Sequence, residues 1–132
     1  MKDAHKENCQ SVHHAWKTHF DNVSHSLHHG YYQGWDLNPA QIPIRYAAVY
    51  SFFLRSLPDM TERLRAFVQK AAQATLVGST FDDAASGQGL LNYFLRGLAC
   101  GALREEEVLR SGITLEELRS RSFLYIVENR RH

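Results

Sequence analysis

Histidine is the residue type whose placement most plainly suggests chemistry in this chain. Seven of the eight histidines lie between His5 and His29. His25 and His29 are one helical turn apart, close enough to bind one metal ion, and Asp21 precedes His25 by four residues. These three residues are the predicted metal ligands. Two other interpretations stay open, namely a solvated polar helix face and pH-sensitive association through histidine charge.

A second group of polar residues follows an aromatic-rich run. Asp36, Asn38 and Gln41 come after Tyr31-Tyr32-Gln33-Gly34-Trp35 and precede a long apolar segment. This order is typical of the βα unit of an α/β barrel, where residues at the carboxyl end of a strand face a pocket. We predict that these three residues bind a substrate, with Asp36 accepting from a hydroxyl group or a metal-bound water. A plain turn, in which Asp and Asn bond only to local backbone, is equally open.

No catalytic residue is predicted, because the common nucleotide and nucleophile motifs are absent from the sequence. It contains no glycine-rich loop of P-loop or Rossmann spacing and no Gly-x-Ser-x-Gly elbow. The aromatic residues Tyr46, Tyr50, Phe52 and Phe53 have no interleaved basic residues. Core packing is therefore favoured over base stacking for this aromatic cluster.

Helical periodicity dominates the elements that must position these residues. A long amphipathic helix ended by Gly30 is predicted from an apolar stripe that recurs every three or four positions, formed by Cys9, Val12, Trp16, Phe20, Val23 and Leu27. Residues 31–37 are predicted to form a short strand. A largely apolar helix is predicted over residues 43–57, and Pro58 is expected to end it and to begin the next helix.

The rest of the chain is predicted to be helical around one loop. Residues 76–89 are rich in Gly, Ser, Asp and Thr and predict a loop or hinge, with Thr80 and Asp83 spaced as a capping box. Helices are expected over residues 90–98 and 104–110 and from the Thr114–Glu117 capping box towards Ser122. Residues 123–127 fit a strand or a packed tail.

These elements predict a mainly α protein with five or six helices and one or two short strands. All 132 residues are expected to form a single domain, made of residues 1–75, a loop over residues 76–89, and a helical extension over residues 90–132. A lone strand lacks hydrogen-bond partners. Residues 31–37 are therefore expected to pair with another chain, to pair with residues 123–127, or to remain a buried linker.

Composition and charge exclude several functional classes. The apolar fraction of 44% and the charged fraction of 22% are those of an ordinary globular protein. The formal net charge of +1 predicts no nucleic-acid partner and no anionic membrane partner. The first residues contain no apolar run, so neither a signal nor an anchor is expected, and a cytoplasmic location is predicted. Cys9 and Cys100 match no zinc or redox spacing and are predicted to be reduced thiols.

Two segments resemble a known family. Gly34-Trp35-Asp36-Leu37-Asn38-Pro39-Ala40-Gln41, followed by Arg45-Tyr46-Ala47-Ala48, resembles the last βα unit of the HpcH/HpaI aldolase and citrate lyase beta-subunit superfamily. Residues 96–103 are similar to a downstream part of an uncharacterised aldolase-like branch. The resemblance implies a helical fragment of a TIM-barrel aldolase. It also implies Mg²⁺ as the cofactor of a carbon-carbon lyase reaction.

The chain departs from that family in two respects. Asn38 stands where the family motif has histidine, and an amide cannot exchange protons near neutral pH. The earlier barrel strands, which carry the acidic metal ligands of the family, have no counterpart in the chain. No cofactor is therefore expected for this chain alone.

Three functions follow as hypotheses. The favoured one is a truncated or split homologue whose helices pack on themselves or on a partner, without independent catalysis. The second is half of a magnesium-dependent aldolase or lyase for 2-keto or 3-hydroxyacyl substrates, active with a complementing barrel chain. The third is a helical interaction or metal-binding protein. Because the helix over residues 43–57 is apolar almost all round, a homo-oligomer or a complementing barrel chain is the expected partner.

Overall fold

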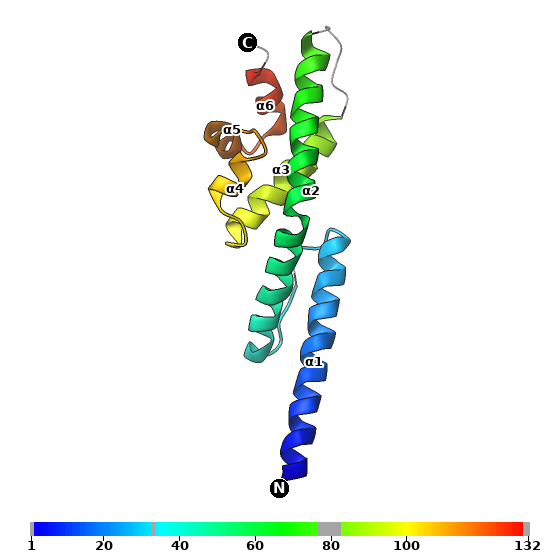
Figure 1. Cartoon of the computed structure of the whole chain (residues 1–132). Helices are drawn as coiled ribbons and strands as arrows, with labels where there is room; N and C mark the ends of the chain where they lie inside the picture. Colours follow the sequence, from blue (N-terminus) through cyan, green and yellow to red (C-terminus); the bar gives the residue numbers. More distant parts are fainter. Residues whose placement is uncertain (1, 33, 77–82, 131–132) are drawn as a thin grey trace. The chain divides into compact units, whose positions relative to one another are not determined.

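The computed structural model describes residues 2–32, 34–76 and 83–130, and these residues are mainly α-helical (Figure 1). The elements are α1 (Lys2–His28), a 3-10 turn η1 (Pro39–Gln41), α2 (Ile42–Leu76), α3 (Ala84–Ala99), α4 (Glu105–Leu109), α5 (Leu115–Ser120) and α6 (Phe123–Asn129). No strand occurs within these described ranges. The predicted mainly α fold is confirmed, whereas the predicted strands are wrong and nothing in the fold supports a barrel fragment.

The chain divides into two compact units, Met1–Leu54 and Arg55–His132. The division falls inside α2, whereas the sequence suggested a boundary in the loop over residues 76–89. Helix α3 already begins at Ala84, inside the segment that was predicted to be a loop. Thr80 lies outside the described residues, and Asp83 occupies the N-cap position of α3 without a side-chain capping bond.

In the first unit, α1 and the beginning of α2 run side by side in the same direction (Figure 1). His19 of α1 and Arg45 of α2 contact the same carboxylate, that of Asp36. About two turns further along both helices, the rings of His28 and Phe52 lie 5.2 Å apart. Two parallel helices require a return segment between them. The chain after α1 supplies it.

This return segment corresponds to residues 31–37, which the sequence predicted to form a strand. Trp35 and Leu37 are 90% and 91% exposed, whereas Tyr32 and Asp36 are partly buried. The ring of Tyr32 packs 6.3 Å from those of Phe52 and Phe53. The strand prediction fails because no described segment offers an edge to pair with. The expected partner, residues 123–127, lies in helix α6.

Helix α2 continues through Pro58, where the sequence predicted a break. Proline lacks an N–H group, so the carbonyl of Leu54 loses its intrahelical donor, at a cost of about 3 kcal/mol. Phe53 before Pro58 and Leu64 and Val68 after it are buried. Burial of apolar side chains on both sides of the proline offsets that cost and keeps one helix.

The second unit has an apolar core formed largely by α3, α4 and α6. Its most buried side chains include Leu91, Phe94, Val108, Phe123 and Ile126. Gly87 belongs to α3, and a Cβ atom at this position would overlap the ring of Phe123. This close approach of α3 to α6 explains a glycine inside the helix, where the sequence predicted a loop.

The C-terminal helices follow their predicted capping signals. Thr114 and Glu117 form the expected capping box of α5, with the Thr114 amide donating to Glu117 Oε2 at 2.7 Å. Burial raises the pKa of Glu117, but the Arg130 hydrogen bond at 2.7 Å and the bonds from Thr114 outweigh it, and the net pKa is lowered. No described helix combines the length and the apolar character that crossing a bilayer requires.

Candidate functional site

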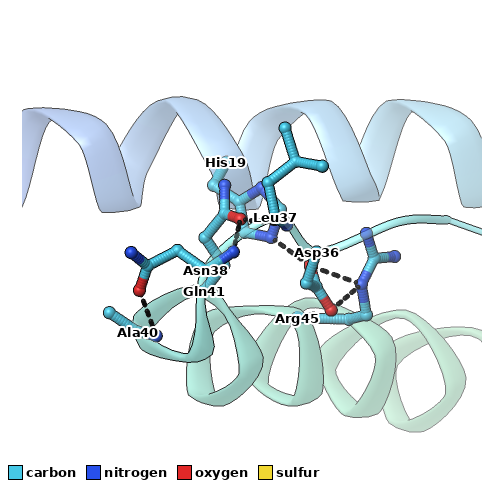
Figure 2. A network of polar contacts seen from close by, with 7 residues as sticks. All are labelled: His19, Asp36, Leu37, Asn38, Ala40, Gln41 and Arg45. Atoms are coloured by element: carbon cyan, nitrogen blue, oxygen red, sulfur yellow. Dashed lines mark hydrogen bonds and ion pairs between the residues drawn. The ribbon is translucent and has the colours of Figure 1, made fainter.

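The carboxylate of Asp36 is the centre of a polar cluster in the first unit (Figure 2). Arg45 Nε donates to both oxygens of Asp36, at 2.8 and 2.7 Å. His19 Nε2 lies 3.0 Å from Asp36 Oδ1. The side chains of His19, Asp36 and Arg45 are only 14%, 16% and 24% exposed. We call these three residues the clasp, because they join α1, the return segment and α2.

The electrostatics of the clasp keep Asp36 ionised. The hydrogen bond from Arg45 lowers the pKa of Asp36, burial opposes this effect, and the charge of Arg45 and the bond to His19 add to the lowering. A carboxylate with a lowered pKa is a poor general base near neutral pH. The geometry therefore suits a structural ion pair better than proton transfer.

Gly34 allows the clasp to close. A Cβ atom at residue 34 would overlap the guanidinium group of Arg45. The backbone of the return segment thus lies directly against Arg45, and any side chain at residue 34 would displace the partner of Asp36. The sequence placed Gly34 in the motif but gave no sign of this contact.

Asn38 and Gln41 form a capping box around η1 (Figure 2). Asn38 Oδ1 accepts from the amide of Ala40 at 2.9 Å. Gln41 Oε1 accepts from the amides of Leu37 and Asn38 at 2.8 and 3.0 Å. Both side-chain oxygens are therefore used by the local turn, as one of the two open interpretations expected. Substrate binding by Asp36, Asn38 and Gln41 stays a prediction.

A pocket of about 180 Å³ lies beside the clasp, between α1 and the return segment. Its lining includes His19, Asn22, Ser26, Tyr31 and Arg45. This volume is below the range of roughly 300–1,000 Å³ typical of small-molecule sites. The pocket can hold only a few atoms.

The predicted metal ligands lie on the exposed side of α1. The rings of His25 and His29 are 4.2 Å apart, and His29 Nδ1 lies 2.8 Å from the carbonyl of His25. Asp21 is paired with Lys17 at 2.6 Å. In the part of the chain that the structure describes, no three His, Cys, Asp or Glu residues are grouped so that they could hold an ion. The metal site at Asp21, His25 and His29 stays a prediction.

The amino-terminal part of α1 projects beyond the start of α2 (Figure 1). His19 lies level with Arg45, near the beginning of α2, so residues 2–15 have no stretch of α2 beside them. At 1.5 Å per residue this segment is about 21 Å long. Every residue from Asp3 to Thr18 is exposed, including Val12 at 46% and Trp16 at 39%. We call residues 2–18 the arm.

The arm continues the apolar stripe of α1 at an interval that keeps it on one face. Cys9, Val12 and Trp16 precede Phe20, Val23 and Leu27 by eleven residues each. Since three turns of helix take about 11 residues, the two triplets lie above one another. The later triplet lies where α2 runs beside α1, with Val23 and Leu27 buried. Periodicity in the sequence predicted the apolar stripe. It could not predict that α2 covers only the second half of the stripe.

Comparison with known proteins identifies the family. The profile of a family described as a domain of unknown function, DUF6986, matches residues 4–126. The chain belongs to the DUF6986 family. The resemblance of Gly34–Gln41 and residues 96–103 to the HpcH/HpaI aldolase and citrate lyase superfamily is therefore wrong as an identification. No curated protein and no solved structure matches the chain.

The description of the DUF6986 family names no activity. The Asp36 carboxylate and the side-chain oxygens of Asn38 and Gln41 form bonds within the chain, whereas the arm of this DUF6986 chain offers an apolar face to its surroundings. The motif that suggested an aldolase is accounted for by turn formation and by the Asp36–Arg45 pair.

Proposed function

We propose that this DUF6986 chain is a helical interaction module without catalysis of its own, which pairs with a second copy of itself through the arm. One observation carries the proposal. The arm is the first part of α1, and it carries the same apolar stripe as the part of α1 that α2 covers. All its described residues from Asp3 onward are nevertheless exposed.

The arm needs a partner to persist as a helix. In proteins most helical stability comes from the packing of an amphipathic face, and ten of the 17 residues of the arm are of lower helix propensity. These ten include three of type Ser, Thr or Asn and three histidines. Packing of the apolar face against another helix supplies the missing stability.

A second copy is the partner that the arm itself suggests. Its three lysines and two acidic residues leave it nearly neutral, so two arms repel each other little. In an antiparallel pair centred between Val12 and His13, Cys9 would lie opposite Trp16 of the partner subunit. A small side chain then faces a large one at both ends of a two-fold interface, which favours close packing.

The clasp has a defined role in this function. It fixes α1 against α2 at His19, the residue that directly follows the arm. The arm is therefore held in a constant direction from a folded base. A partner then binds a pre-oriented helix and less conformational entropy is lost on association.

The test is the oligomeric state of Val12→Glu measured by light scattering across a concentration series. We expect the unmodified chain to form a dimer and Val12→Glu to be monomeric, because the new charge would be buried at the two-fold axis. Ser11→Glu is the matched control, since residue 11 lies well away from the stripe, and it should stay dimeric. A monomeric unmodified chain at all concentrations, or equal effects of both variants, would overturn the proposal. Circular dichroism checks that both variants are folded.

A further inference from the structure

The second unit contains a pocket of about 530 Å³ that the interaction function does not use. It lies between α3, α4, α5 and the residues just after α5. Its lining combines the apolar side chains of Leu95 and Leu118 with charged groups. The volume falls in the range of roughly 300–1,000 Å³ that accommodates small organic ligands.

The charged groups of the lining are predominantly basic. They are Arg96, Arg119 and Arg121, opposed by the single acidic residue Glu105. Within the described ranges, the guanidinium groups of Arg119 and Arg121 form no ion pair, and both residues are exposed. Two unpaired guanidinium groups beside an apolar floor present a planar fork of N–H donors to an anion.

The backbone at Arg121 gives a separate indication. Arg121 has a φ of 55°, in the left-handed region, and occupies the C-cap position of α5. Glycine or asparagine usually takes left-handed positions at helix ends, because other residues are strained there. The carbonyl of Arg121 accepts from Gln88 Nε2 at 3.0 Å, which pins this conformation to α3. The strained position places an arginine on the wall of the pocket.

We propose that this pocket binds a small organic phosphate ester. Arg119 and Arg121 would contact the phosphate, and Leu95 and Leu118 would contact the apolar body of the ligand. Glu105 would repel the anion and weaken its binding. Such a site recognises the charged group and the apolar group together, so neither inorganic phosphate nor a neutral aromatic compound should bind as well.

The experiment is calorimetric titration of the full chain with phenyl phosphate, using inorganic phosphate, phenol and benzoate as comparison probes. Phenyl phosphate should bind at least tenfold more tightly than each of the other three. Binding should also weaken as salt is added, since exposed charges are screened. Equal affinity for phenol would show that the arginines contribute nothing. Equal affinity for inorganic phosphate would remove the role of the apolar floor, and equal affinity for benzoate would contradict the phosphate assignment.

Three substitutions in the lining and one control outside it localise the site. Arg119→Gln should weaken phenyl phosphate binding at least tenfold, whereas Arg63→Gln, an exposed arginine of α2 outside the lining, should leave it unchanged. Glu105→Gln should strengthen binding several-fold, an effect that loss of folding cannot produce. Arg121→Gly should raise the melting temperature by relieving the left-handed strain and should also weaken binding. Unchanged affinity in both arginine variants of the lining would overturn the proposal.

Discussion

Asp36 is the residue on which the first unit depends most directly. Its two oxygens receive Arg45 Nε, and His19 lies within hydrogen-bond distance of Oδ1. These contacts join residues that are seventeen and nine positions away in the sequence. The sequence singled out Asp36 from its place in a motif, but it could not predict its partners, because they depend on the parallel packing of two helices.

Asp36→Asn is expected to destabilise the folded chain by about 1.5–3 kcal/mol, the range for a hydrogen bond to a charged group. The substitution leaves the Arg45 guanidinium without its counter-charge. Urea denaturation monitored by circular dichroism measures the free energy of unfolding. Asp21→Asn is the matched control, because Asp21 pairs with Lys17 on the exposed surface, and it should cost no more than about 1 kcal/mol. Equal losses in the two variants would contradict the role of the clasp.

The clasp also predicts a pH dependence. Hydrogen bonding by Arg45 lowers the pKa of Asp36 in the folded chain below its ordinary value of 3.8. The unfolded chain therefore takes up this proton first as the pH falls, and the stabilisation by Asp36 is complete above about pH 4 and is lost below it. The stability difference between the unmodified chain and Asp36→Asn should therefore be fully present at pH 5. It should shrink in more acidic solutions. A difference that persists undiminished at pH 2 would contradict the ionic character of the contact.

Gly34→Ala should destabilise the chain, since its Cβ atom would displace the Arg45 guanidinium from the clasp. Gly89→Ala is a control with the opposite expected sign. Residue 89 lies in α3, its Cβ atom would meet open space, and alanine stabilises a helix by about 0.5–1 kcal/mol relative to glycine. Melting temperatures of both variants and of the unmodified chain, measured under the same conditions, test these two expectations. A harmless Gly34→Ala would mean that the Arg45 guanidinium can move aside without losing its contact with Asp36, and that the clasp does not require glycine at residue 34.

The elements show where sequence reasoning succeeds and where it stops. Helix α1, its end at Gly30 and the capping box of α5 are local features, and periodicity and residue type predicted them correctly. The strand over residues 31–37 was wrong because aromatic side chains favour strands only where a neighbouring strand exists. Gly87 suggested a loop, but it lies in helix α3. Glycine is needed there because the ring of Phe123 leaves no room for a Cβ atom, and no local sequence pattern shows this contact.

The prediction that a helix ends at Pro58 was wrong. The energetic cost of proline in a helix can be read from the local sequence, whereas the burial of apolar side chains that offsets this cost depends on tertiary packing. Pro58→Ala restores a donor for the carbonyl of Leu54, and we expect the free energy of unfolding to rise by about 1–3 kcal/mol. Urea denaturation of the purified variant tests this. Stability that is unchanged or lower would show that α2 requires proline at this position, for example for its curvature.

The whole molecule consists of two compact units that share α2. The first unit contains the arm, and the second contains the arginine-lined pocket. Hydrophobic periodicity correctly predicted a mainly α-helical chain. Family identity could not be read from the motif at residues 34–41, because its glycine, aspartate, asparagine and glutamine all have structural contacts in the clasp and in η1.

Self-association through the arm is most directly tested by amide hydrogen exchange of α1 at several protein concentrations. Exchange reports local opening, so pairing of two arms should slow exchange in residues 4–15 as the concentration rises. Residues 23–28 of the same helix, which lie beside α2, should be protected to the same degree throughout and serve as the internal reference. Rapid, concentration-independent exchange across residues 4–15 would contradict the proposed pairing.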